Sequence, residues 1–441
     1  MLEPLSSAFI VPAPSRSFSG CRMDAAVAEH SVLTEDSCSM KTTPSFSSHM
    51  RPSLLVKKSL GTGPQVRENT QRLAELALEA PSLIARSIRQ HLESEDTLVK
   101  EVEEGLMAGR SPELVQDCCG GTYLMSNAQG KQCAVFKPAD EEPYAPENPK
   151  GYVGSEMYSS SPLKEGVEVG MAAERECAAY LLDHGHRGNV PRTVMLRIHH
   201  SRPELKYGSL QVYVHNICSV EDMGPSKFES ADVHNIAILD IRLCNSDRHP
   251  GNILVTQAEG GKFRLVPIDH GFVLPKWRYL HDLDFCWLHW PQAKQPFTDE
   301  EIQYIDELDA EADADFLRNA LSLSEDCLRT LHIGTMLLKL GAHAGLTLQE
   351  IGTMMVRPHH DERSVLEQEV WRSEEMTLKE LRRYPSGVLR VINAFDGHAA
   401  MDAAFLRHLR TNLGAAIENK LAQRPRTDDG GLSDVIGSIE L

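Results

Sequence analysis

The hydrophobic positions of this chain change their spacing along its length, and each change predicts a different kind of element. Residues 1–67 are rich in Ser, Pro and Thr and lack a sustained apolar period, which predicts a disordered leader. Over residues 68–110, apolar side chains recur mostly at helical steps. We therefore expect a helical lead-in whose second helix spans Asp96 to Met107.

Alternating patterns follow the lead-in and predict strands. Thr122–Met125 and Gln132–Phe136 flank the polar, glycine-containing segment Ser126–Gly130, an arrangement typical of a β-hairpin. Further patterns predict one helix and then two strands: Arg175–Asp183, Val190–Ile198 and Ser209–Val214.

From Glu221 onward the periodicity is mainly helical, interrupted by two short predicted strands, Ile253–Thr256 and Phe263–Ile268. A β-rich half followed by a helical half indicates an α+β fold of two lobes. We expect three parts after the lead-in, namely an N-lobe, a C-lobe and a helical extension with a polar tail: 111–216, 217–375 and 376–441.

The charge of the chain excludes one class of partner. Its 63 acidic and 45 basic residues give a formal net charge of −18, and so acidic a protein does not bind nucleic acid through its overall field. The ten cysteines are scattered without the spacing of a zinc site, which indicates reduced thiols in a cytoplasmic setting. No apolar run reaches the roughly 18 residues that a membrane-spanning helix needs.

The most informative motif lies in the predicted C-lobe. Asp247 and Asn252 stand five positions apart within Asn-Ser-Asp-Arg-His-Pro-Gly-Asn, and Asp269 follows within Ile-Asp-His-Gly. Protein kinases place a base Asp and a metal-binding Asn at this same spacing, and add a second metal-binding Asp further on. Asp247 would then lie beside the attacking hydroxyl, while Asn252 and Asp269 would hold a metal ion under the phosphates. The motif predicts a phosphoryl-transfer site.

A second group of residues, in the predicted N-lobe, suits the phosphate side of such a site. Gly120, Gly121 and Thr122 precede the hairpin, where small residues let backbone N–H groups approach phosphate oxygens. Lys137, on an otherwise apolar strand, can reach the phosphates as a point charge. Each feature alone is more often structural, but their order along the chain is the order that a kinase requires.

Two further roles complete the predicted site. Either Glu174 or Glu176 can meet Lys137 from the following helix, because two positions apart on a helix they point about 200° from each other. We favour Glu176, since apolar residues share its inward-facing side. The strand that leads into the linker between the lobes ends near Val214, whose backbone groups would bind adenine.

Seven segments together carry a resemblance to a known family: Gly120–Tyr123, Ala134–Pro138, Asp140–Gly151, Arg175–Asp183, Asn245–Asn252, Ile268–Gly271 and Trp287–Lys294. Through them the chain resembles the phosphatidylinositol 3-/4-kinase superfamily, and specifically the phosphatidylinositol 4-kinase type II/gamma branch that is found in plants. The resemblance covers residues 98–355 and leaves out the leader and most of the last 80 residues.

This resemblance implies a bilobal, protein-kinase-like fold that uses ATP with Mg²⁺ or Mn²⁺. It implies transfer of the γ-phosphoryl group to the 4-hydroxyl of phosphatidylinositol in a membrane surface. Together with the cysteine pattern, this leads us to expect a cytoplasmic protein that is peripheral on membranes. By the same resemblance Lys137 holds phosphates, Glu176 braces Lys137, and Asp247 orients the acceptor hydroxyl or takes its proton. Asn252 and Asp269 would bind the metal.

Arg248 and His249 occupy the Asp-Arg-His positions of the family motif and are assigned to catalysis with Asp247. His249 would stabilise the transferred charge or share the proton transfer, since imidazole titrates near working pH. Two alternatives to a lipid kinase stay open. The same residues would serve a Ser/Thr protein kinase that acts on protein substrates, and a nucleotide-binding scaffold is the non-enzyme alternative.

Two other charged segments each allow a functional and a structural interpretation. The acidic run Asp309–Asp315 lacks the Gly and the final Glu of a calcium-binding loop, so it predicts a solvated helix face. A basic group close to Trp277 would either contact a membrane or be packing and surface charge. This group consists of Lys276, Arg278 and Lys294.

Overall fold

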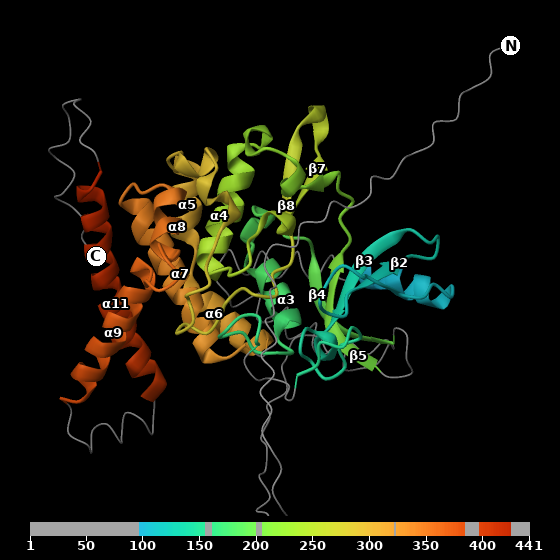
Figure 1. Ribbon diagram of the computed structural model, residues 1–441, viewed down its shortest axis with the longest axis horizontal. Helices are drawn as coiled ribbons and strands as arrows, with labels where there is room; N and C mark the ends of the chain where they lie inside the picture. The colour runs from blue at the N-terminus through green and yellow to red at the C-terminus, as the bar shows by residue number, and fades with distance from the viewer. Residues whose placement is uncertain (1–96, 155–160, 200–204, 322, 384–396, 425–441) are drawn as a thin grey trace, which may run out of the picture. The chain divides into compact units, whose positions relative to one another are not determined.

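The computed structural model describes five stretches of the chain: 97–154, 161–199, 205–321, 323–383 and 397–424. The predicted leader and the first helix of the lead-in lie outside the described residues. The described part confirms the α+β fold of two lobes. A five-stranded antiparallel sheet comes first, and a helical half with a second, three-stranded sheet follows it (Figure 1).

The five-stranded sheet belongs to the N-lobe and has the strand order β1-β2-β3-β5-β4. A helix over residues 97–107 shares a buried apolar cluster with this sheet through Leu98 and Val102. The strand predicted over Val190–Ile198 begins later in the structure, as β4, because Pro191 has no N–H to donate to a neighbouring strand. The strands are β1 (Glu113–Leu114), β2 (Tyr123–Ser126), β3 (Gln132–Pro138), β4 (Thr193–His199) and β5 (Leu205–Val212).

The predicted hairpin is present as β2 and β3, and it decides where Lys137 lies. Alternate side chains of β3 are buried, with Ala134 and Phe136 inside the apolar cluster of the sheet. Because neighbouring side chains of a strand point to opposite faces, Lys137 lies on the other face, where it meets helix α3 (Ala172–Leu182).

Helix α3 lies between the five-stranded sheet and the helical half, and it is buried along almost its whole length (Figure 1). Glu142 holds the start of this helix, since its carboxylate accepts hydrogen bonds from the N–H of Ala173 in the first turn (3.0 Å) and from that of Gly170 just before the helix (2.7 Å). Burial raises the pKa of Glu142 to about 7, although these N–H groups favour its charged form. The Glu142 carboxylate thus holds in place the helix that carries Glu176.

The C-lobe contains a small antiparallel sheet and a set of helices around a large apolar cluster. The small sheet has the order β6 (Cys218–Ser219), β7 (Ile253–Gln257) and β8 (Phe263–Pro267). Helices α4 and α7 contact each other through this cluster. The helices are α4 (Ser230–Leu243), α5 (Asp299–Glu307), α6 (Ala310–Ala320), α7 (Glu325–His343), α8 (Leu348–Met355), α9 (Val365–Leu381) and α11 (Gly397–Ala422).

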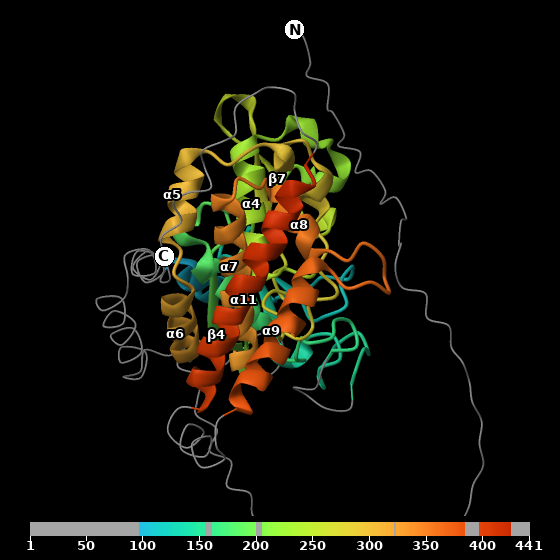
Figure 2. The same ribbon diagram turned by 90° about the vertical axis from the view of Figure 1, so that its left-hand side faces the viewer.

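The predicted boundary between the C-lobe and its extension, at residue 375, is wrong. It falls inside α9, and α9 lies against α11 (Figure 2). Leu409 and Leu413 of α11 are fully buried in the same apolar cluster as α4 and α7. The described part of the extension is therefore packed into the C-lobe core, because its apolar side chains find partners there.

One acidic residue in the run Asp309–Asp315 is buried, contrary to the solvated face predicted for the whole run. Asp309 is the N-cap of α6, and its side chain accepts hydrogen bonds from the first turn. Asp313 is 1% exposed and forms ion pairs with His184 (3.0 Å) and Arg242. Both partners come from distant parts of the chain, so the run itself carries no sign of this burial.

Trp277 is packed inside the C-lobe, and the contact of its basic neighbours with a membrane stays a prediction. Trp277 is 1% exposed, and Arg278 lies over its ring at 4.2 Å from the centroid. Lys276 is paired with Glu168 at 2.7 Å, whereas Arg278 and Lys294 are both exposed. No helix within the described ranges combines the length and the low polarity needed to cross a membrane.

Candidate active site

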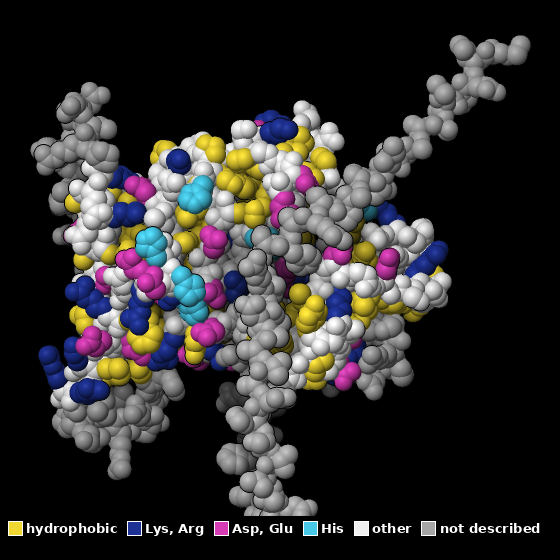
Figure 3. Space-filling view, in the orientation of Figure 1, with side chains coloured by type: hydrophobic (Ala, Val, Ile, Leu, Met, Phe, Trp, Pro, Cys, Tyr) yellow, Lys and Arg dark blue, Asp and Glu magenta, His cyan; other side chains and the backbone are white. Residues whose placement is uncertain are grey.

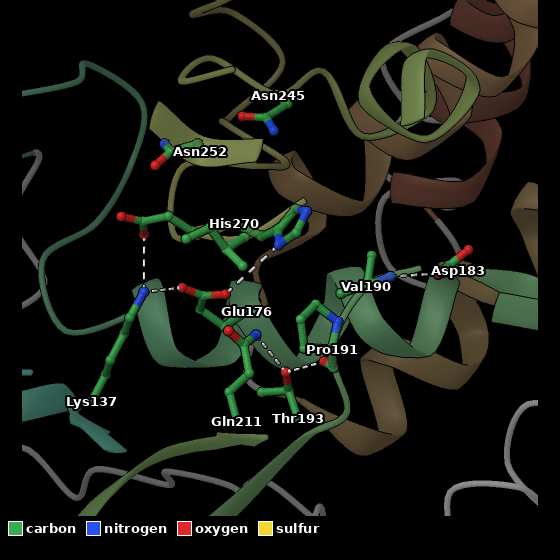
Figure 4. A network of polar contacts seen from close by, with 12 residues as sticks. Lys137, Glu176, Asp183, Val190, Pro191, Thr193, Gln211, Asn245, Asn252 and His270 are labelled. Atoms are coloured by element: carbon green, nitrogen blue, oxygen red, sulfur yellow. Dashed lines mark hydrogen bonds and ion pairs between the residues drawn. The ribbon is translucent and has the colours of Figure 1, made fainter. Parts of the chain in front are cut away.

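Lys137 and Glu176 form an ion pair between strand β3 and helix α3 (Figure 4). The Nζ atom of Lys137 also lies 3.0 Å from Oδ1 of Asp269, which follows β8. Burial opposes the charge of Lys137, but the carboxylates of Asp269 and Glu176 hold its pKa above the ordinary value. Burial likewise opposes the charge of Glu176, but Lys137 holds the pKa of this carboxyl well below its usual range. Three segments thus bring opposite charges to one point.

Of the two candidate glutamates on α3, the structure places Glu176 against Lys137 and directs Glu174 elsewhere. Glu174 is buried, and its carboxylate accepts a hydrogen bond from the hydroxyl of Tyr207 on β5 (2.7 Å). The two side chains diverge because positions two apart on a helix differ by about 200°.

The loop that carries Asp247 begins where helix α4 ends. Cys244 has a φ of 47°, a left-handed conformation that turns the chain out of the helix. Asn245 Oδ1 then accepts a hydrogen bond from the N–H of Asp247 (3.0 Å). Asn252 Nδ2 donates to the backbone carbonyl of Asp247 (3.0 Å). The amide side chains of the loop therefore hold together the two residues that the spacing in the sequence singled out.

The polar groups around Asp247 fit a divalent cation. Asp247, Asn252 and Asp269 offer oxygen atoms, which Mg²⁺ and Mn²⁺ prefer. Burial raises the pKa of Asp247, and the nearby negative charge of Asp269 raises it further, so a cation between them would relieve this repulsion. Asn252 donates through Nδ2, which leaves its Oδ1 as the coordinating atom.

The same donor set is incomplete without a ligand. Among the described residues, no group of three His, Cys, Asp or Glu side chains forms a metal site. Asp269 has a φ of 55°, a left-handed conformation that Asp tolerates better than most residues, and its side chain is 48% exposed. Asn252 and Asp269 would therefore hold a metal whose remaining ligands are phosphate and water oxygens, as is usual for Mg²⁺.

Arg248 and His249, both predicted to be catalytic, lie in different surroundings. Arg248 is buried, and its Nε donates to both carboxylate oxygens of Asp240 (3.1 and 2.9 Å). Its Nη1 donates to the carbonyl of Asn252 (2.6 Å). Arg248 is therefore a positioning residue that does not face the reacting atoms, which corrects the prediction. His249 is exposed, and its Nδ1 accepts from the N–H of Gly251 (3.1 Å), so only Nε2 is left for the predicted role.

Asp240, on the last turns of α4, anchors Arg248, and the sequence analysis did not single it out. Its carboxylate also accepts hydrogen bonds from Asn245 Nδ2 (2.9 Å) and Trp287 Nε1 (3.0 Å). The side chain is 1% exposed. The sequence held one signal for it, a single carboxylate within the apolar run Ile236–Ile241.

The predicted phosphate-binding glycines lie on the loop between β1 and β2. The N–H of Gly121 donates to the carbonyl of Glu141 (2.7 Å), and a Cβ at Gly121 would lie 2.4 Å from the Glu141 carboxylate. Glycine is thus required here by the close approach of Glu141, and the prediction that this N–H binds phosphate is wrong. Gly120 is buried beside Pro143, whereas Thr122 is half-buried.

Two residues from a later loop hold the same β1–β2 loop, and the sequence analysis assigned neither of them a role. Lys150 Nζ donates to the carbonyls of Val115 (2.6 Å) and Gln116 (3.3 Å). Asn148 Nδ2 donates to the carbonyl of Cys119 (2.9 Å). In a trans peptide the N–H points away from the C=O, so the N–H groups of these peptides point away from Lys150 and Asn148. We therefore expect N–H groups of the β1–β2 loop to bind phosphate. The signal in the sequence for this arrangement is the Asn-Pro-Lys segment that contains both side chains.

Val214 lies on the linker that follows β5. The linker covers residues 213–217 and joins the five-stranded sheet to β6. Val214 is half-buried there, and its predicted contact with adenine stays a prediction.

The fold and the site together define the protein-kinase-like class. Its parts, spread over two lobes, are the ion pair between β3 and α3, the loop after α4 and the carboxylate after β8. A sequence model described as phosphatidylinositol 3- and 4-kinase matches residues 119–351, more than half of the chain, and the chain belongs to this family.

Several plant proteins are similar to this chain. It is 43% identical over 301 residues to phosphatidylinositol 4-kinase gamma 4 of Arabidopsis thaliana, a match that covers 64% of this chain and 52% of that protein. It is 43% identical over 287 residues to phosphatidylinositol 4-kinase gamma 4 of Oryza sativa subsp. japonica, covering 62% and 50%. Phosphatidylinositol 4-kinase gamma 2 of Arabidopsis thaliana is 39% identical over 341 residues, covering 71% and 61%. The chain spans about half the length of the curated relatives it matches.

Proposed function

We propose that this protein transfers the γ-phosphoryl group of ATP to the 4-hydroxyl of phosphatidylinositol. One observation carries the proposal of phosphoryl transfer: Lys137, Glu176 and Asp269 converge from three segments, as the phosphate-binding side of a kinase requires. The choice of acceptor is supported by the relatives, whose names describe phosphatidylinositol 4-kinases.

The proposed reaction depends on positioning and charge neutralisation more than on covalent chemistry. Lys137, braced by Glu176, binds phosphate oxygens of ATP as a point charge. Asn252 and Asp269 would hold Mg²⁺ or Mn²⁺, which would neutralise the charge of the phosphates. Asp247 orients the acceptor hydroxyl and accepts its hydrogen. Burial and the charge of Asp269 raise the pKa of Asp247, which makes its carboxylate a better proton acceptor than an ordinary one.

A lipid acceptor requires contact with a membrane surface, and we propose a cytoplasmic protein that associates with membranes peripherally. On the face shown in Figure 3, the described Lys and Arg side chains are interspersed with Asp and Glu and do not gather into one basic patch. A net charge of −18 also opposes anionic membranes. We therefore expect membrane contact to be transient and local to the site.

The deciding experiment offers radiolabelled ATP and Mg²⁺ to the purified full chain, with phosphatidylinositol vesicles and a generic protein acceptor in parallel. Label in phosphatidylinositol 4-phosphate, identified by chromatography of the deacylated product, supports the proposal. Label in protein alone would contradict it and favour a Ser/Thr protein kinase. Tight binding of ATP without label in either acceptor would favour the scaffold. Lys137→Met serves as the background control.

Lys150→Met should weaken the use of ATP, because the β1–β2 loop loses the ammonium that holds its carbonyls. We expect the KM for ATP to rise about tenfold, equivalent to about 1.4 kcal/mol of binding, with little change in the KM for the acceptor. Steady-state kinetics with each substrate varied in turn measures both. Lys131→Met, on the exposed hairpin turn, is the matched control. An unchanged KM for ATP would show that Lys150 does not shape the nucleotide site.

A further inference from the structure

Two buried polar atoms of the site face each other without a hydrogen bond. Among the described residues, neither Oε2 of Glu176 nor Nδ1 of His270 has a hydrogen-bond partner, and the two atoms are 3.8 Å apart. Figure 4 shows the His270 ring directed at the Glu176 carboxylate, on the side away from Lys137. Buried polar atoms normally have partners, so this alignment indicates a function.

The other ring nitrogen decides which tautomer His270 adopts. Nε2 of His270 lies 3.0 Å from Nη2 of Arg248. A guanidinium only donates, so Nε2 accepts this hydrogen bond and Nδ1 carries the hydrogen. The Nδ1–H group therefore faces a carboxylate oxygen of Glu176, a donor opposite an acceptor. The reverse tautomer would bring two donors together at Arg248.

Arg248 is in turn held in place by the protein. Its Nε is bonded to Asp240, and its Nη1 donates to the carbonyls of Asn252 (2.6 Å) and Ile268 (3.1 Å). Because Nε and Nη1 are both hydrogen-bonded, the guanidinium cannot rotate, and Nη2 points toward His270. Arg248, on the loop that carries Asp247, thus fixes the orientation of the His270 ring.

We propose that His270 is a positioning residue that couples the loop of Asp247 to the Lys137–Glu176 pair. The imidazole orients the Glu176 carboxylate so that Oε1 faces Lys137. The position of the phosphate-binding ammonium then depends on the position of the loop that carries Asp247. The gap closes to a hydrogen bond with a movement of about 1 Å, because such bonds measure about 2.7–3.2 Å. The inference deepens the proposed function and rests on it.

A phenylalanine at this position tests the role, because it keeps a ring but has neither nitrogen; the protein-kinase motif D-F-G has that residue. Glutamine restores both contacts, since its oxygen can accept from Arg248 while its NH₂ donates to Glu176. For His270→Phe we expect kcat to fall and the KM for ATP to rise, each about tenfold, with the acceptor KM within about twofold. For His270→Gln we expect both constants within about threefold of wild type. Kinetics with each substrate and calorimetric titration of ATP give these values.

Three further results sharpen the test. Adding Glu176→Gln to His270→Phe should reduce kcat/KM by much less than the product of the two single effects, since His270 is proposed to act on Lys137 through Glu176. His343→Phe, on the exposed side of α7, is the matched control and should behave as wild type. Wild-type kinetics in His270→Phe would overturn the inference.

The remaining outcomes are also decisive. If His270→Phe no longer unfolds cooperatively on heating, the test rests on His270→Gln. Retained activity of His270→Gln then supports the positioning role of His270, and a tenfold loss of activity in a folded His270→Gln protein overturns it. A wild-type protein that neither binds ATP nor transfers phosphate would instead contradict the proposed function, and the inference with it.

Discussion

Asp247→Asn should reduce phosphoryl transfer severely while leaving the binding of ATP intact. The Asp247 carboxylate is the group proposed to orient the acceptor hydroxyl and take its hydrogen, and an amide cannot accept a proton there. Proton transfer by a positioned side chain contributes about 10²–10⁴-fold to a rate, so we expect kcat to fall by this factor. The radiolabel assay with phosphatidylinositol vesicles measures the loss.

Binding of ATP should persist because the substitution preserves the shape of the loop. Asn252 donates to the backbone carbonyl of Asp247 (3.0 Å), which the substitution retains. Removal of one charge also relieves the repulsion from Asp269 that raises the pKa of Asp247. Calorimetric titration of ATP should therefore give a Kd within about threefold of wild type. Asp222→Asn, at an exposed position, is the matched control. Near-normal turnover in Asp247→Asn would show that another residue serves as the base.

Asp240→Ala should lower the free energy of unfolding by about 3–5 kcal/mol, because it leaves a buried cation without its partner. The Asp240 carboxylate neutralises Arg248 at 2.9 Å and also accepts from Trp287 Nε1 at 3.0 Å. Arg248 is 1% exposed, so water cannot replace the lost carboxylate. Urea denaturation of the full chain, followed by far-ultraviolet circular dichroism, measures the change.

A matched substitution on the surface separates this effect from the loss of any carboxylate. Asp315 pairs with Arg318 on α6, and its side chain is 59% exposed. Asp315→Ala should change the free energy of unfolding by about 1 kcal/mol or less, since exposed ion pairs contribute little. If Asp240→Ala were equally mild, Arg248 would not depend on Asp240 for its charge, and the positioning role assigned to this pair would be wrong.

Features that depend on neighbours in the chain are predictable from the sequence. The alternation in β2 and β3 indicates the hairpin, and it also places Lys137 on the face opposite Phe136. The spacing of Asp247 and Asn252 suits one short loop, and the structure joins them by a hydrogen bond within that loop. Glu176 follows from helical geometry, which separates it from Glu174.

Features that depend on distant partners are not predictable in this way. Asp313 stands in an acidic run that looks solvated, but His184 lies 129 positions away and pairs with it in the core. Trp277 stands next to exposed basic residues in the sequence, but its indole packs inside the C-lobe. The described part of the C-terminal extension joins the C-lobe core through apolar contacts between α9, α11 and α7.

By itself the sequence determined the order of the elements, the two-lobed class and the residue types of a phosphoryl-transfer site, because spacing and alternation are local properties. Only the tertiary structure decided what the neighbours of Asp247 do. Arg248 is turned inward by Asp240, and His270 links Arg248 to Glu176, through contacts between α4, the segment after β8 and α3. Burial sets these roles, because a guanidinium or an imidazole removed from water must take its partners from whichever segments the fold brings near it.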